Sequence, residues 1–117
     1  MAQNSQIAFA PLGKTVVIPA AASAPTGVQA LVDARFDAQS TGQYRIINSS
    51  AYTVFLGVGS TAAIATANAV APIAGTPSSA IVLVPGAVEI LRFNINTYFS
   101  GLSSAAATVY ITPGQGL

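Results

Sequence analysis

The sequence of 117 residues contains no histidine, no cysteine and no tryptophan. Without cysteine, neither a disulfide framework nor a thiolate metal site can form. Serine and threonine are plentiful, but a nucleophilic hydroxyl needs a neighbouring base, and histidine, the usual base, is missing. We therefore expect no enzymatic activity, no cofactor and no metal centre. The absence of cysteine also suits a reducing cytoplasm.

Charged side chains are also scarce, at 6% of residues, whereas about a quarter are charged in an ordinary soluble domain. None occurs from residue 46 to residue 88. The charged residues are Lys14, Asp33, Arg35, Asp37, Arg45, Glu89 and Arg92. So few charges cannot form the mixed, charged surface of a free monomer, and we infer that partners cover much of the chain. The scattered cations and the net charge of +1 argue against nucleic acid as a partner.

Three of these charges alternate along the chain, at Asp33, Arg35 and Asp37, and would project from one face of a strand. Paired carboxylates suit calcium binding or acid–base chemistry in principle. A calcium ion needs six to eight oxygen ligands, however, and the whole chain has three carboxylate side chains. We therefore predict a solvated or inter-subunit ion-pair stripe, and we place these residues among the candidate interface residues.

The length suits a single domain, which we place at residues 14–117. The segment before it has no basic region and no long apolar run, and no apolar run anywhere reaches 18 residues. We therefore expect no secretory signal and no membrane helix. Residues 1–13 form a candidate N-terminal arm, because the apolar Ile7, Phe9 and Leu12 follow a polar start. Either the arm is a disordered terminus, or these three side chains dock on a neighbouring chain.

Short β-prone runs recur about every ten residues between turn residues, which predicts an all-β fold. The strand count favours a single-domain β-sandwich, jelly-roll-like, with an extended arm. Residues 61–71 are ambiguous between helix, strand and loop, and we favour a strand. Two pairs, 43–48 with 52–58 and 80–84 with 87–93, are predicted to be hairpins. The expected strands cover residues 16–18, 28–36, 43–48, 52–58, 80–84, 87–93, 98–102 and 107–112.

The alternation of side chains predicts which faces are buried. In residues 107–112 the odd positions are apolar and the even positions carry hydroxyl groups, as in a half-buried strand. Residues 52–58 are apolar on both faces. Such a strand is either central and covered on both sides or lies at a subunit interface. Tyr52 and Phe55 are therefore candidate interface residues.

Two short runs match sequence patterns of functional sites, but only weakly. The run Gly57-Val58-Gly59-Ser60-Thr61-Ala62 loosely matches a dinucleotide-binding loop, but it shows no convincing helix and no βαβ context. We interpret its glycines as belonging to a turn or bulge. The run Asn48-Ser49-Ser50 fits the glycosylation pattern, and without a signal peptide we assign it no function.

Three segments give the chain a family resemblance: Tyr44-Arg45-Ile46-Ile47-Asn48 with Thr53-Val54-Phe55, Leu83-Val84-Pro85-Gly86-Ala87-Val88-Glu89, and the ending Val109-Tyr110-Ile111-Thr112-Pro113-Gly114-Gln115-Gly116. Over residues 43–117 the chain resembles small structural proteins of tailed bacteriophages, and among them the head decoration or cement proteins. The resemblance implies a β-sandwich or jelly roll on the outer surface of the virion capsid, made in the host cytoplasm. It implies the major capsid protein as partner, together with self-association as a homodimer or homotrimer, and it implies no catalytic residues.

A second interpretation remains open. The chain would then be a subunit of a phage tail, baseplate or head fibre with a host-surface or glycan-binding role, present in few copies. An enzyme or a small-molecule carrier is disfavoured by the residue inventory described above.

Overall fold

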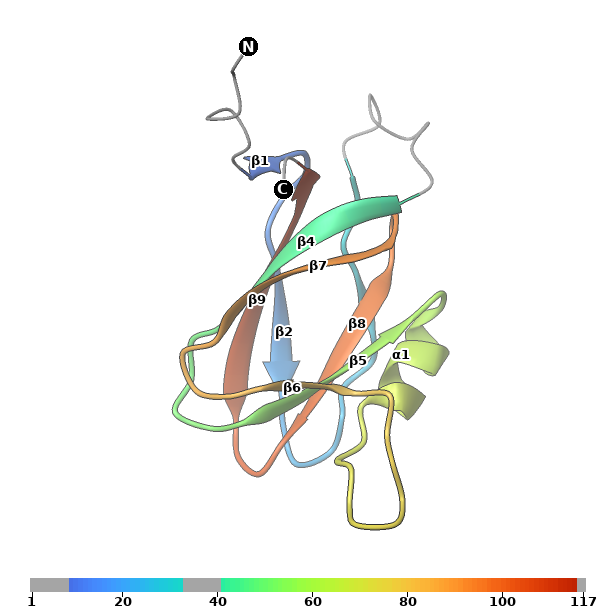
Figure 1. Ribbon diagram of the computed structural model, residues 1–117, viewed down its shortest axis with the longest axis vertical. Coiled ribbons are helices and arrows are strands. Elements are labelled where there is room, and N and C mark those ends of the chain that lie inside the picture. The colour runs from blue at the N-terminus through green and yellow to red at the C-terminus, as the bar shows by residue number, and fades with distance from the viewer. Residues whose placement is uncertain (1–8, 33–40, 116–117) are drawn as a thin grey trace.

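The computed structural model describes residues 9–32 and 41–115. In this part of the chain Figure 1 shows two β-sheets facing each other and one short helix outside them. The elements in chain order are β1 (Ala10–Pro11), β2 (Val16–Ala20), β3 (Val28–Gln29), β4 (Thr41–Asn48), β5 (Val54–Gly59), α1 (Ala62–Asn68), β6 (Ile81–Leu83), β7 (Val88–Asn94), β8 (Tyr98–Ser103) and β9 (Ala107–Gln115).

The first sheet has the strand order β2-β9-β4-β7, and β1 continues along the same strand β9 that β2 pairs with. The second sheet has the order β3-β8-β5-β6. All these pairings are antiparallel. From β2 onward the chain changes sheets at every connection except the one between β5 and β6. The prediction of an all-β fold is confirmed, and the two facing sheets agree with a sandwich.

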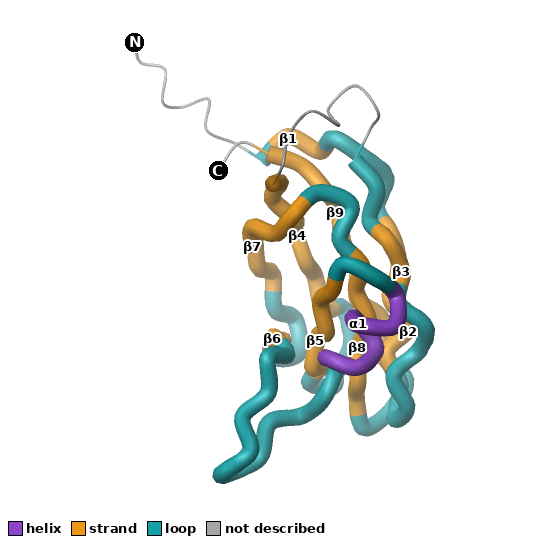
Figure 2. The backbone as a smooth tube through the Cα atoms, turned by 90° about the vertical axis from the view of Figure 1, so that its right-hand side faces the viewer, coloured by secondary structure: helices purple, strands orange, loops and turns teal. Residues whose placement is uncertain are grey.

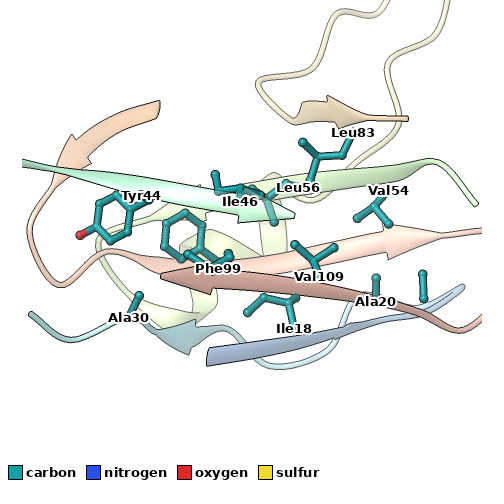
Figure 3. Close-up of a cluster of buried hydrophobic side chains, with 12 residues drawn as sticks. Ile18, Ala20, Ala30, Tyr44, Ile46, Val54, Leu56, Leu83, Phe99 and Val109 are labelled. Carbon is teal, nitrogen blue, oxygen red and sulfur yellow. The ribbon is translucent and has the colours of Figure 1, made fainter. Parts of the chain in front are cut away.

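The core lies between the two sheets and takes side chains from both (Figure 3). In β9 the predicted alternation is confirmed, because Ala107, Val109 and Ile111 are buried while Tyr110 is exposed. Three aromatic rings meet at one end of the core. The Phe99 ring centroid lies 5.2 Å from that of Tyr44 and 5.9 Å from that of Phe93.

Both predicted hairpins are wrong, because their strands belong to different sheets. Strand β4 pairs with β7 and β9, whereas β5 pairs with β6 and β8. The turn chemistry at Pro85 and Gly86 was nevertheless identified correctly. The Ala87 N–H donates to the Val84 carbonyl over 3.0 Å, and Gly86 has a φ of +77°, as the third residue of a type II turn requires. The turn forms, but it joins two sheets.

The predicted strand over residues 28–36 is shorter in the structure, where β3 covers Val28–Gln29. The backbone beyond it bonds to the β7–β8 turn, and Val32 forms an isolated antiparallel bridge with Gly13. The Ala30 N–H donates to the Thr97 carbonyl and the Val32 N–H to Asn96 Oδ1, each over 3.0 Å. Residues 33–36 lie outside the described part of the chain.

The preference for a strand at residues 61–71 is wrong, because Ala62–Asn68 form helix α1. Thr61 caps the helix, and its Oγ1 accepts a hydrogen bond from the Ile64 N–H over 3.2 Å. The four alanines of α1 favour a helix, and its β-branched residues did not override that preference. Figure 2 shows α1 lying against the second sheet near β5 and β8.

The glycines of β5 allow α1 to approach the sheet. A Cβ atom at Gly57 would overlap the Ala65 carbonyl oxygen and the Ala69 backbone nitrogen. Gly57 and Gly59 therefore lie in a strand beneath a helix, and their interpretation as turn or bulge glycines is wrong. A helix does follow them, but β5 and β6 are antiparallel, so the βαβ unit of a dinucleotide site does not form here.

Substitution of Gly57 by alanine should lower the free energy of unfolding by about 3 kcal/mol or more, because the clash is with backbone atoms. Gly42→Ala is a matched control in another central strand. Its new Cβ would lie 3.6 Å from Ile95 Cγ2, an ordinary contact, and we expect a loss below about 1 kcal/mol. Urea denaturation of both variants measures the difference, and equal losses would contradict the close packing of α1.

Asn48, at the end of β4, is fully buried and joins two of the connections between the sheets. Its Nδ2 donates to the carbonyls of Tyr52 over 2.8 Å, Leu83 over 3.0 Å and Val84 over 3.2 Å. Its Oδ1 accepts hydrogen bonds from the Ser50 N–H and from the Ser50 hydroxyl. The amide that would carry a glycan is thus inside the protein, so the glycosylation pattern at Asn48 is structural in this fold.

We expect Asn48→Ala to lower the free energy of unfolding by about 2 to 4 kcal/mol, because three carbonyl groups lose a buried donor. Ser49→Ala, one residue further along, removes an exposed hydroxyl and should change stability by less than about 0.5 kcal/mol. The same loss in both variants, measured by chemical denaturation, would show that Asn48 does not hold the two connections together.

Candidate interaction surfaces

Groups that could hold a metal ion or carry charge are few in the described residues. Among residues 9–32 and 41–115, no three His, Cys, Asp or Glu side chains gather where they could hold a metal ion. The four charged side chains of this part, Lys14, Arg45, Glu89 and Arg92, are all exposed. No helix within the described ranges has the length and apolar character needed to cross a membrane.

The described part of the predicted arm lies on the sheet of its own chain. Strand β1 pairs with the end of β9, and the Leu12 N–H donates to the Pro113 carbonyl over 2.9 Å. Phe9 is half-buried and its ring lies directly over Gly114, where a Cβ atom would overlap it. Phe9 and Leu12 are thus engaged within the chain. The third predicted arm residue, Ile7, lies outside the described residues.

The predicted ion-pair stripe of Asp33, Arg35 and Asp37 also lies outside the described residues.

The candidate interface residues Tyr52 and Phe55 lie apart from the arm. Tyr52 precedes β5, and Phe55 is the second residue of that strand. Tyr52 is in the connection from β4 and leaves 45% of its surface exposed. Phe55 is half-buried and stands directly opposite Val82 of β6 and Leu102 of β8. It alternates with the buried Val54 and Leu56, so its side chain lies on the outer face of the second sheet. The structure therefore covers the outer face of β5 with α1 at Gly57 and leaves Phe55 partly open.

A second apolar group lies on the outer face of the first sheet. Val17, Tyr110, Ile47 and Val88 are directly opposite one another in β2, β9, β4 and β7, so they form one row across four strands. Val17 and Val88 are 49% and 59% exposed. Sequence reasoning missed this row, because it exists only in the register of strands that are far apart in the chain.

A third surface is the projecting loop between α1 and β6, residues 69–80, which we call the finger. Figures 1 and 2 both show it extending away from the body of the protein and from the two chain ends. Ile73, near its tip, is the most exposed large apolar side chain of the described residues, at 67%. The long charge-free run contains the finger, but nothing in that run distinguished Ile73 from a core residue.

The structure also has several modest hollows, one of them of about 580 Å³ beside α1 and residues 24–26. Two others have charged or amide side chains in their lining. One, of about 430 Å³, lies at the edge between β2 and β3 and is lined by residues that include Lys14, Val16 and Leu31. The other, of about 380 Å³, lies at the β7–β8 turn, and Ser60, Asn94 and Asn96 are among its lining residues. The side chains that line the second hollow are uncharged, so it suits a neutral ligand better than an ionic one.

Comparison of the chain with protein-family models, with curated protein sequences and with solved structures finds no match. The exposed surfaces and the resemblance noted in the sequence are therefore the features that bear on a function.

Substitution of Phe55 by alanine should lower the free energy of unfolding by about 1 to 2 kcal/mol, because its ring is half-buried on an outer face. Phe99→Ala removes a fully buried ring from the aromatic group and should cost about 3 to 5 kcal/mol. Thermal and urea denaturation of both variants test this order. Equal losses would place Phe55 in the core rather than on a surface.

Proposed function

We propose that the protein is a structural virion protein, a capsid decoration or cement protein that binds the outer surface of a phage head and stabilises the lattice of the major capsid protein. The observation that carries the proposal is an exposed surface rich in large apolar side chains and poor in charge. Those exposed in the described part of the chain are Val17, Leu31, Tyr52, Ile64, Val70, Ile73, Val82, Val84, Val88 and Tyr110. Exposed apolar groups of this kind mark surfaces that other proteins cover.

We further propose that the sandwich is a jelly roll. Eight strands, β2 to β9, divide equally between the orders β2-β9-β4-β7 and β3-β8-β5-β6. Two four-stranded antiparallel sheets, between which the chain passes repeatedly, support this assignment, since capsid proteins and lectins use that architecture. In this proposal the residues before Phe9 form the N-terminal arm, and Ile7 docks on a neighbouring chain.

Reinforcement of a shell needs binding and no chemistry. A protein that binds the closed lattice and not the separate subunits stabilises that lattice by mass action. A standard interface buries about 800 Å² of each partner. That is roughly an eighth of the 6122 Å² that this chain exposes. In this proposal the outer face around Phe55, the row across the first sheet and the finger supply such contacts, either to the major capsid protein or to a second and third copy of the chain.

One observation favours the second function, a subunit of a tail, baseplate or head fibre with a glycan-binding role. The hollow at the β7–β8 turn has two asparagine amides and a serine hydroxyl in its lining, and its other lining residues are uncharged. Uncharged donors and acceptors around a concave surface suit a neutral polyhydroxylated ligand. This function differs from the first in copy number.

The number of copies in virus particles decides between these functions. In gradient-purified virus particles, we expect the number of copies of this chain, divided by the number of copies of the major shell protein, to be near one or a simple fraction of one. Quantitative mass spectrometry of the particles measures the ratio. A handful of copies per particle would instead support the tail or fibre, and absence from particles would overturn both.

The same measurement tests the arm. A chain that lacks residues 1–8 retains all the strands described above, so its far-UV circular dichroism should be unchanged while its occupancy on particles falls. Unchanged occupancy would contradict docking by the arm.

A further inference from the structure

Strand β7 is the long open edge of the first sheet. It covers Val88–Asn94 and pairs with β4 on one side, and no described strand lies along its other side (Figure 2). In an antiparallel strand, alternate residues direct their N–H and C=O groups to opposite sides, so half of those in β7 point away from β4. Such a row of backbone groups is a template on which another strand can pair.

The other strand edges of the described part are short or closed. Strands β1, β3 and β6 have two, two and three residues. Strand β2, at the opposite edge of the first sheet, contains Pro19, which has no N–H to offer. Isolated bridges also close that side of the sandwich before and after β2. They join Gly13 to Val32 and Ala21 to Leu102. Two copies of the chain could therefore pair most extensively through β7.

The sequence of β7 favours pairing in every respect except its charges. Four of its seven residues are apolar, and none is a proline or a glycine. The other residues include Glu89 and Arg92, which are two of the four charged residues in the described part of the chain. Since only 6% of the whole chain is charged, two charges in one open edge strand are a marked concentration.

Glu89 lies on the side of the sheet that faces the core. It stands directly opposite Ile46 of β4, which is fully buried, and opposite residues of an antiparallel pair share a face. Leu91 and Phe93 alternate with Glu89 along β7 and share that face. The Glu89 side chain is nevertheless exposed, because it lies at the open margin of the core. A strand paired with β7 would take its carboxylate out of water, next to apolar side chains.

The pairing of two β7 strands gives Glu89 no counter-charge. Arg92 stands opposite Gln43 and belongs to the other face of the sheet. In an antiparallel pair of two β7 strands, opposite residues again share a face. Glu89 would therefore meet Glu89, Leu91 or Phe93 of the second copy, and in no register its Arg92. A carboxylate covered without a counter-charge strongly opposes association.

We propose that Glu89 keeps the open edge of β7 from pairing with the same edge of a second copy of the chain. A charge that points inward from an edge strand opposes pairing in this way. It costs the free protein little, because the carboxylate stays in water until a second strand covers it. The inference goes beyond the proposed function and holds whether or not the chain binds a capsid. Any self-association of the unmodified chain then uses surfaces other than the β7 edge.

Glu89→Val tests the proposal, because it leaves apolar side chains at three alternate positions on the core-side face of β7. We expect it to raise the association constant for a dimer at least about tenfold above that of the unmodified chain, as measured by sedimentation equilibrium. Loss of one negative charge raises the net charge from +1 to +2, so weaker overall repulsion cannot explain the gain. We expect a closed dimer, because the pairing uses the long edge of both copies.

Two control variants separate the charge at this edge from other effects. Glu89→Lys keeps a charge at the same position, so it should associate no more than the unmodified chain. Arg45→Val makes the same kind of change in β4, which is paired on both sides, and should likewise leave association unchanged. Circular dichroism checks that all three variants remain folded, as the exposure of both residues leads us to expect.

Amide hydrogen exchange shows where the two copies meet. In Glu89→Val, the β7 amides that point away from β4 should exchange more slowly than they do in the unmodified chain, because the second copy accepts their hydrogen bonds. The amides of β6 and of the finger should keep their rates.

Association of Glu89→Val alone, with slower exchange in β7, is the expected result. The proposal is overturned if Glu89→Val associates no more than the unmodified chain, or if Glu89→Lys or Arg45→Val associates as strongly. A Glu89→Val dimer without slower exchange in β7 would place the contact elsewhere and also overturn it. So would an unmodified chain that already pairs through β7.

Discussion

The structure depends on the hydrogen bonds that backbone groups receive where the chain crosses between its two sheets. Strand β4 supplies a buried polar side chain near each end. Asn48 donates to carbonyls of Tyr52 in the β4–β5 connection, Leu83 at the end of β6 and Val84 in the β6–β7 connection. At the other end the Tyr44 hydroxyl donates to the Asn94 carbonyl over 2.8 Å, at the β7–β8 connection. Burial raises the pKa of Tyr44 above its usual 10.0, so the hydroxyl stays a donor. One central strand therefore secures three of the crossings, because a buried carbonyl without a donor would cost too much.

Close backbone packing holds the domain together although charged side chains are scarce. Gly57 lets α1 lie directly on β5, and the Pro25 carbonyl accepts hydrogen bonds from Thr66 of α1 and Ser100 of β8. The helix thus covers part of a strand that is apolar on both faces. What remains uncovered is the outer face around Phe55, the row across the first sheet and the finger. Packing within the domain does not explain why these exposed surfaces carry apolar side chains.

The sequence predicted what local patterns determine and missed what depends on distant partners. The alternation in β9 identified its buried face, and the Pro85-Gly86 turn was recognised, because both follow from a few adjacent residues. The hairpins failed because a turn fixes the path of the chain and not the sheet to which the next strand belongs. Asn48 resembled a glycosylation site, since its acceptors at Leu83 and Val84 lie 35 and 36 residues away. Helix α1 was missed because its alanines and β-branched residues gave opposite local preferences.

A charge-poor protein with exposed apolar groups is prone to pair with itself through open strand edges. The edges of the second sheet, β3 and β6, are only two and three residues long, which limits edge-to-edge association. The finger achieves the same with two prolines, Pro72 and Pro77, while backbone hydrogen bonds between Ile73 and Thr76 hold its turn. These features limit strand pairing without adding a charge. Association through the exposed apolar side chains would depend on shape and preorganisation, because electrostatic steering needs charges and residues 46–88 carry none.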